Sequence, residues 1–188
     1  LCGCRIMLKT YDQRRCKSGN DPGSRKTNEW RCFRACGSIN IIFMAQFTRL
    51  QVANVMNDTG LVPLFYESDL NKACEVLAAC YKGGARLLEF TARGDFAHEV
   101  FGELVKYATK ELPGMILGVG SVTDAASASR FLSLGANFVV TPVLREDIAI
   151  VCNRRKILWS PGCGSLTEIA RAEELGCEIV KLFPGGVY

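Results

Sequence analysis

The stretch MILGVGSVTDAASASRFLSLGANFVVTP, residues 115–142, decides the fold class of this 188-residue chain. An apolar run over residues 115–121 is followed by an amphipathic segment, residues 124–134, and by a second apolar run, residues 138–142. Apolar runs of this length suit buried strands, and a glycine after an amphipathic segment is a typical helix end. The stretch therefore predicts a strand, a helix and a second, parallel strand.

The same alternation repeats along the chain with a period of roughly two dozen residues. The predicted strands are residues 61–66, 86–91, 115–121, 138–142, 157–161 and 178–183, and the predicted helices between them are residues 68–81, 96–111, 124–134, 145–153 and 165–175. Ser68 is the expected cap of the first of these helices. Three helices are expected to end in left-handed glycine caps, at Gly83, Gly135 and Gly176. A short additional helix is expected after Met44.

Six successive strand-helix units fit either an open doubly wound sheet or a closed (β/α)₈ barrel. The glycines of GVGSV, residues 118–122, resemble a dinucleotide-binding fingerprint only superficially, because the third glycine is missing and the segment follows the third predicted strand. We therefore predict an α/β fold, namely an incomplete (β/α)₈ TIM barrel with about six of the eight units present. A barrel without its last strands does not close.

Charge and cysteine divide the chain near residue 43. Residues 1–43 hold nine Lys or Arg against three Asp or Glu, whereas residues 44–188 hold fourteen against sixteen. The first segment shows no helical or strand periodicity, and it lacks the apolar core of a secretory signal. We predict an unstructured or non-native leader over residues 1–43 and the partial barrel over residues 44–188.

Composition argues against several classes of partner. The barrel region has no stripe of basic and aromatic residues for nucleic acid, and no apolar run long enough to span a membrane. The early cysteines lack regular zinc-ligand spacing and the sole histidine, His98, is distant, so no metal is expected. The later cysteines occur singly, as is typical of reduced thiols in a cytoplasmic protein; they are Cys74, Cys80, Cys152, Cys163 and Cys177.

Enzymes with this barrel place reacting groups where the strands end. Lys181 lies within the apolar run IVKLFP, where a charged ammonium is costly without a partner or a purpose. A buried lysine keeps some neutral amine that can attack a ketone and form a Schiff base. Two other interpretations stay open: an ion pair with a carboxylate such as Glu89, or an edge strand from which the amine reaches solvent.

The second predicted strand ends in LEFTAR, residues 88–93, which supplies three further candidates. Glu89 and Thr91 share one face of the strand, so both are expected to point into the barrel, where Glu89 suits a general acid and base. Arg93 follows the strand end and suits a substrate carboxylate. A structural ion pair for Glu89 and a solvated loop position for Arg93 are the alternatives. His98 has no nearby nucleophile and is interpreted as a surface or packing residue.

The motifs LEFTAR, GVGSV, SPGCGSLTEI and VKLFP occur on predicted strands two, three, five and six. In this order they resemble the KHG/KDPG aldolases from about Met44 to the end of the chain. The resemblance implies a homotrimeric (β/α)₈ barrel of the Entner–Doudoroff pathway without metal or other cofactor. It also implies cleavage of 2-keto-3-deoxy-6-phosphogluconate to pyruvate and glyceraldehyde 3-phosphate, and of 4-hydroxy-2-oxoglutarate to pyruvate and glyoxylate.

The same resemblance implies a role for each candidate residue. Lys181 matches the Schiff-base lysine and Glu89 the acid and base. The expected substrate-binding residues are Arg93, Thr91, Ser121, Pro142 and Phe183, of which Ser121 stands where the family usually has threonine, while Pro142 and Phe183 line the pyruvate pocket.

The chain ends seven residues after Lys181, whereas the family continues with two more strand-helix units and a phosphate site. We therefore expect a C-terminally truncated aldolase sequence. One alternative is an inactive barrel fragment that acts only in binding or assembly through its open sheet edges. Another is a related aldolase that acts on a different 2-keto acid.

Overall fold

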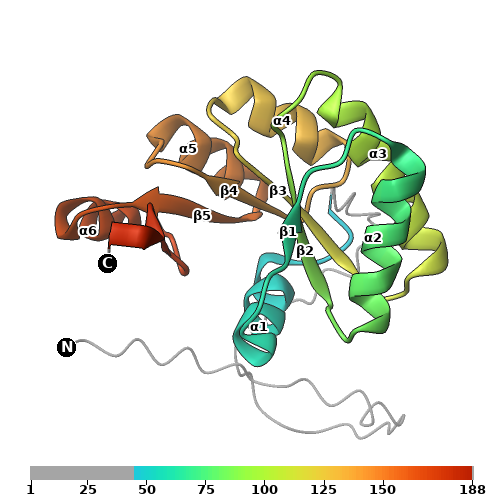
Figure 1. Cartoon of the computed structure of the whole chain (residues 1–188). Helices are drawn as coiled ribbons and strands as arrows, with labels where there is room; N and C mark the ends of the chain where they lie inside the picture. The colour runs from blue at the N-terminus through green and yellow to red at the C-terminus, as the bar shows by residue number, and fades with distance from the viewer. Residues whose placement is uncertain (1–44, 188) are drawn as a thin grey trace, which may run out of the picture. The chain divides into compact units, whose positions relative to one another are not determined.

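In the computed structural model, the structure describes residues 45–187, which form parallel strands and helices in strict alternation after an initial helix (Figure 1). The strands are β1 Leu64–Phe65, β2 Leu87–Thr91, β3 Ile116–Gly120, β4 Phe138–Thr141, β5 Leu158–Cys163 and β6 Lys181–Leu182. The helices are α1 Arg49–Thr59, α2 Leu70–Lys82, α3 Ala97–Glu111, α4 Ala125–Ser133, α5 Glu146–Arg155, α6 Leu166–Glu174 and the short 3₁₀ helix η1 Gly185–Val187. The predicted leader, residues 1–43, lies outside the described residues.

The strand order identifies the architecture. The strands lie in the order β1-β2-β3-β4-β5-β6, and every hydrogen-bonded pair is parallel. A doubly wound sheet reverses its order at a switch point, whereas a barrel adds each new strand beside the last. The prediction of a (β/α)₈-type fold is confirmed, and the described residues form a half-barrel.

Successive residues of the central strands pack into two separate hydrophobic cores, one on each side of the sheet. Leu88, Phe90 and Val119 point outward and pack with the buried faces of α2 to α5, which cover one side of the sheet in Figure 1. Leu87, Ile116, Phe138 and Leu158 point to the other side and form an inner core with Val52 of α1. Since side chains alternate along a strand, this arrangement places Glu89 and Thr91 on the inner side with Leu87.

Most helices begin at side-chain caps. Thr48 caps α1 in a capping box with Gln51, and Asp124 caps α4 by accepting from the Ser127 backbone N–H at 2.8 Å. The predicted cap at Ser68 is wrong, because Asp69 accepts from the backbone N–H of Lys72 at 3.1 Å. The carboxylate one residue later is in the right position for the N3 donor, so the helix begins at Leu70.

The glycine caps were predicted correctly at two positions and wrongly at one. Gly135 and Gly176 have positive φ values of 103° and 79°. Gly83 has an ordinary helical φ of −71°, and the left-handed residue is its neighbour Gly84, with φ 99°. In the pair Gly83-Gly84 the helix continues one residue further than predicted, and the second glycine makes the turn.

The two outer strands are shorter than predicted. Only Leu64–Phe65 and Lys181–Leu182 pair, against predicted runs of six residues each. Each has one hydrogen-bonded neighbour among the described strands, so fewer of its backbone groups are held in a ladder. Within residues 45–187, no helix is both long and apolar enough to cross a membrane.

Candidate functional site

Glu89 lies on β2, on the inner face of the half-barrel, and is only 5% exposed. Its neighbours in register are Leu64 of β1 and Gly118 of β3, so the strand pairing fixes its backbone on both sides. Strand alternation places the buried Glu89 and Thr91 on the face of Leu87, which lies in the inner core, as predicted.

Gly120 of β3 provides the space that the Glu89 carboxylate occupies. A Cβ atom on Gly120 would overlap Oε1 and Cδ of Glu89 and would lie 2.8 Å from its Cγ. The carboxylate therefore lies directly against the β3 backbone and leans toward the C-terminal end of the strands. The sequence indicated GVGSV as a family motif but not this role of Gly120, which becomes visible only when the β2–β3 register is known.

Burial raises the pKa of Glu89 above its ordinary value, and the positive charges of Lys181 and Arg93 counteract that rise in part. The larger effect is desolvation, since a carboxylate loses more hydration than a carboxylic acid on leaving water. Glu89 is thus a carboxyl group poised to exchange a proton, with two cationic side chains close enough to influence it.

Lys181 lies on β6, where it pairs in register with Gly162 of β5. Its ammonium nitrogen, Nζ, is 5.1 Å from the ring centroid of Phe183. The apolar enclosure predicted from IVKLFP is only partly present, because Lys181 is half-buried and Leu182 is 53% exposed. The reason is the edge position of β6 among the described strands, and an edge strand was one of the interpretations of Lys181 that the sequence left open.

Arg93 and Ser121 meet beyond the ends of β2 and β3. The Arg93 Nε–H donates to Ser121 Oγ at 3.3 Å, and the Arg93 backbone N–H donates to the Thr91 carbonyl at 2.9 Å, which makes a tight turn after β2. Ser121 itself has a positive φ of 60°, so the chain turns sharply there. An exposed guanidinium beside a hydroxyl forms a suitable pair of donors for a carboxylate.

The other predicted substrate-binding residues, Thr91, Pro142 and Phe183, differ in their burial and in their contacts. The Thr91 hydroxyl donates to the Phe65 carbonyl at 3.3 Å, so it is already engaged with the end of β1. Pro142 is half-buried, and its carbonyl lies so close to Gly162 that a Cβ there would overlap it. Phe183 is 43% exposed and contacts Lys181. Among the described residues, Pro142 and Lys181 share no hydrogen bond or ring contact, and their common pocket stays a prediction.

Two further buried polar side chains of the strands were not predicted as site residues: Ser160 lies on the inner face with Leu158, and Thr141 lies on the outer face with Val139. Thr141 and Ser160 are 0% and 6% exposed, and both belong to strands that otherwise carry apolar residues. The Thr141 hydroxyl donates to the Val143 carbonyl at 2.7 Å and shapes the loop after β4. A polar residue inside a continuous apolar run was the sequence signal that could have identified Ser160.

The arrangement combines a primary amine, a carboxyl group of raised pKa and a guanidinium at one end of a parallel sheet. A neutral lysine can add to a carbonyl, a buried glutamate can move the protons that this addition requires, and an arginine can hold an anionic substrate group. Among residues 45–187, His, Cys, Asp and Glu side chains form no cluster suited to a metal ion.

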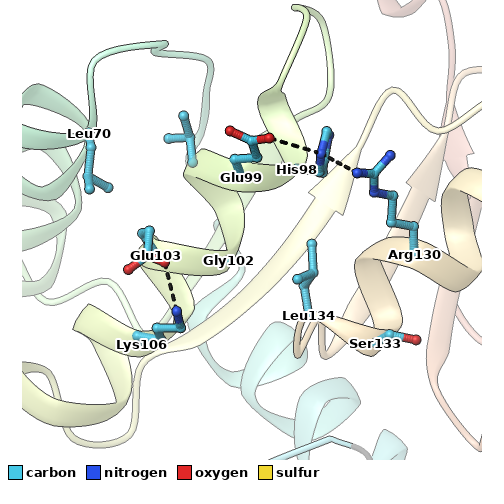
Figure 2. Close-up of a pocket in the computed structure, with 10 residues that line it drawn as sticks. Leu70, His98, Glu99, Gly102, Glu103, Lys106, Arg130, Ser133 and Leu134 are labelled. Atoms are coloured by element: carbon cyan, nitrogen blue, oxygen red, sulfur yellow. Dashed lines mark hydrogen bonds and ion pairs between the residues drawn. The ribbon is translucent and has the colours of Figure 1, made fainter.

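The hollow shown in Figure 2 lies elsewhere, on the outer helical layer. His98 contacts Arg130 of α4 there, and its Nε2 is 3.8 Å from Glu99 Oε1. Lys106 and Glu103 form a separate ion pair of 2.7 Å along α3. His98 is therefore a partly exposed residue between two helices, which agrees with its interpretation as a surface or packing residue.

The family model and the curated relatives indicate one family. Residues 52–188 match the family described as KDPG and KHG aldolase. The 2-dehydro-3-deoxy-phosphogluconate aldolase of Pseudoalteromonas atlantica is 30% identical over 148 residues, which cover 77% of this chain and 67% of that protein. The KHG/KDPG aldolase of Escherichia coli strain K12 is 27% identical, over 71% of this chain and 63% of that protein.

A solved structure supports the same conclusion about the fold. The 2-keto-3-deoxy-6-phosphogluconate aldolase of Zymomonas mobilis ZM4, determined with 3-phosphoglycerate, superimposes with a TM-score of 0.66 at 26% identity. The match covers 74% of this chain and 64% of that one. The chain thus spans 63% to 67% of the length of these three proteins.

Proposed function

Because the chain belongs to the KDPG and KHG aldolase family through residues 52–188, we propose that it is a class I aldolase for 2-keto-3-deoxy-6-phosphogluconate. The products are pyruvate and glyceraldehyde 3-phosphate. The observation that carries the proposal is the buried Glu89 carboxyl on the inner face, packed against Gly120, with Lys181 and Arg93 near enough for their charges to lower its pKa. These are the three side chains that a Schiff-base cleavage of an anionic keto acid requires.

Substrate binding begins with the carboxylate of the keto acid. Arg93 and Ser121, which are already joined by a hydrogen bond of 3.3 Å, take that carboxylate between them. The carbonyl carbon next to the carboxylate then faces Lys181 and Glu89. Pro142 and Phe183 form the apolar wall around the short pyruvate end, and Thr91 limits the pocket at β1.

Covalent chemistry follows at Lys181. The neutral amine adds to the carbonyl carbon, and the protonated Glu89 carboxyl gives its proton to the carbonyl oxygen to form a carbinolamine. Loss of water from the carbinolamine leaves a positively charged iminium that joins Lys181 to the substrate. Its positive nitrogen supplies the electron sink for the next step.

Cleavage uses the carboxylate form of Glu89. The carboxylate removes the proton of the hydroxyl group at C4, the C3–C4 bond breaks, and its electron pair moves toward the iminium nitrogen as an enamine. The aldehyde leaves, Glu89 passes the proton that it took from the C4 hydroxyl to C3 of the enamine, and water then releases pyruvate and restores the lysine. A carboxyl group with a raised pKa suits both directions of this proton transfer.

The proposal also covers a second substrate, the oligomeric state and the cellular location. 4-Hydroxy-2-oxoglutarate, cleaved to pyruvate and glyoxylate, is the second substrate, because it presents the same carboxylate and carbonyl to Arg93, Ser121 and Lys181. A homotrimer is proposed from family membership. A cytoplasmic location is proposed because the five described cysteines are unpaired thiols. A role in the Entner–Doudoroff pathway is proposed from family membership.

Borohydride reduction in the presence of pyruvate tests the proposal. Reduction traps the iminium, so peptide mass analysis should find a reduced pyruvate adduct on Lys181. Lys181→Ala is the control for the site, and Lys156→Ala, which changes an exposed lysine after α5, is the matched control for nonspecific labelling. A folded sample without an adduct on Lys181 would favour the alternative of a chain that acts only in binding or assembly.

A further inference from the structure

Tyr66 is an aromatic residue at the end of β1 that no step of the proposed mechanism uses. In β1, Leu64 is in register with Glu89 and Phe65 with Phe90, so Tyr66 follows at the same end of the sheet as Thr91 and Arg93. It is 37% exposed. Tyr66 therefore lies beside the turn that carries Arg93, the proposed ligand of the substrate carboxylate.

The ring of Tyr66 is held by two neighbours. On one side it packs on Phe90, with ring centroids 5.9 Å apart and planes tilted by 49°. On the other side it lies against Gly94, so closely that a Cβ on Gly94 would overlap the Tyr66 hydroxyl and lie 2.5 Å from Cζ. Glycine is therefore the residue at position 94 that leaves room for the tyrosine.

The turn that Tyr66 touches carries Arg93. The backbone of this turn is fixed by two hydrogen bonds, from Ala92 N–H to the Gly120 carbonyl and from Arg93 N–H to the Thr91 carbonyl, both 2.9 Å. The Arg93 guanidinium itself makes one hydrogen bond within residues 45–187, from Nε to Ser121 Oγ at 3.3 Å. The direction of this exposed side chain thus depends on the course of its own backbone.

From these contacts we infer that Tyr66 is a positioning residue for Arg93, acting through Gly94. The phenol ring forms a wall against Gly94 of the turn, and the wall keeps the guanidinium beside Ser121, where the keto-acid carboxylate binds. The inference rests on the proposed function for the identity of the anion. It assigns to Tyr66 an effect on binding of the pyruvate end and none on proton transfer at Glu89.

The test measures the pyruvate concentration that gives half-maximal borohydride labelling of Lys181 in the full chain. Tyr66→Ala removes the wall and is expected to raise that concentration about tenfold, equivalent to about 1.4 kcal/mol. Tyr66→Phe keeps the ring against Gly94 and is expected to restore the value to within about twofold. Gly94→Ala pushes the ring away and is expected to resemble Tyr66→Ala.

A double-mutant cycle at Tyr66 and Gly94 distinguishes a positioning effect on Arg93 from a general loss of stability. The double variant Tyr66→Ala/Gly94→Ala should be no worse than either single variant, because both changes abolish one contact. Tyr107→Ala, which changes a half-buried tyrosine of α3, should lower the thermal midpoint without changing the pyruvate dependence. Equal pyruvate dependence in Tyr66→Ala and the parent, or additive effects in the double variant, would overturn the inference. Absence of labelling in the parent chain would instead refute the proposed function itself.

Discussion

Gly118 and Gly120 lie two residues apart on β3 and face different neighbours. A methyl group on Gly118 would enter the ring of Phe138 in the inner core, whereas one on Gly120 would enter the carboxylate of Glu89. Gly118 therefore leaves room for the packing of Phe138, and Gly120 leaves room for the Glu89 carboxylate. The same substitution at the two positions should have different consequences.

We expect Gly120→Ala to reduce kcat for keto-acid cleavage about 100-fold, because a displacement of about 1 Å at a reacting group has effects of this size. Gly118→Ala should instead lower the free energy of unfolding by about 1–3 kcal/mol through overpacking. Steady-state kinetics and urea unfolding on both variants measure the contrast. Equal loss of kcat in two equally stable variants would contradict the role given to Gly120.

Glu89 links activity to stability. Burial raises its pKa in the folded state, so the folded chain binds this proton more tightly than the unfolded chain does. The contribution of Glu89 to the free energy of unfolding is therefore fully present below the unfolded pKa and is lost as pH rises through the folded pKa. At neutral pH the buried carboxylate costs stability.

Glu89→Gln keeps the shape of the side chain and removes its charge. We expect the variant to be more stable than the parent at about pH 7, and the two to converge near pH 4, where an ordinary glutamate begins to protonate. Urea unfolding at both pH values measures this, and cleavage activity should be lost. A variant that is less stable than the parent at neutral pH would show that the Lys181 and Arg93 charges outweigh desolvation.

At the scale of single elements, α4 depends on one aspartate. Asp124 accepts from the backbone N–H of Ser127 at 2.8 Å and from its hydroxyl at 2.7 Å. These hydrogen bonds lower the pKa of Asp124, the backbone bond being the larger cause. The stabilisation is thus present above the unfolded pKa and is lost as pH falls through the folded pKa.

We expect Asp124→Ala to lower the free energy of unfolding by about 1 kcal/mol, the usual contribution of a helix N-cap. Asp124→Asn keeps a side-chain oxygen for the Ser127 backbone N–H and should retain most of the stability, but it should lose the part of the pH dependence that Asp124 contributes below about pH 4. Thermal unfolding between about pH 2 and pH 6, a range that spans the ordinary aspartate pKa, compares the three chains. An Asn variant as unstable as the Ala variant would argue against the capping role.

Helices with a clear amphipathic pattern in their own residues were predicted well from the sequence. The amphipathic period placed α3 and α4 within one residue at each end, because the outward helix faces are polar and the inward faces meet the sheet. The ends of β1 and β6 were predicted too long, since strand length depends on a pairing partner that the local sequence does not encode. The cap at Asp69 and the turn at Gly84 differ from the predictions by one residue each.

At the scale of the whole molecule, the order of the strands followed from their alternation with helices, and the positions of Glu89 and Thr91 followed from the period of a strand. The functions of Gly120 and Gly94 could not be predicted. Each depends on a contact with a neighbouring strand or its loop, where only the register and the side-chain directions show which atoms would overlap. The half-exposed state of Lys181 likewise depends on strand neighbours.

Arg49 connects the first described helix with the region that leads to Lys181. From α1, its guanidinium donates to Asn153 Oδ1 of α5 at 2.7 Å, to Glu178 Oε2 at 2.6 Å and to the carbonyl of Gly176. Its side chain is 17% exposed, so these bonds are partly shielded from water. Through them, α1 holds the segment between α6 and β6, which carries few other backbone hydrogen bonds.

We expect Arg49→Met to lower the free energy of unfolding by about 2 kcal/mol, the typical value for hydrogen bonds to a charged group. Amide exchange should accelerate more in residues 176–183 than in β2 or β3, because the loss is local to the segment that Arg49 holds. Labelling of Lys181 by pyruvate and borohydride should weaken in parallel. Lys106→Met, which breaks an exposed ion pair with Glu103, is the matched control and should change stability by less than about 0.5 kcal/mol. Uniform acceleration of exchange across the sheet would mean that Arg49 stabilises the whole fold, with no specific hold on the strand that carries the lysine.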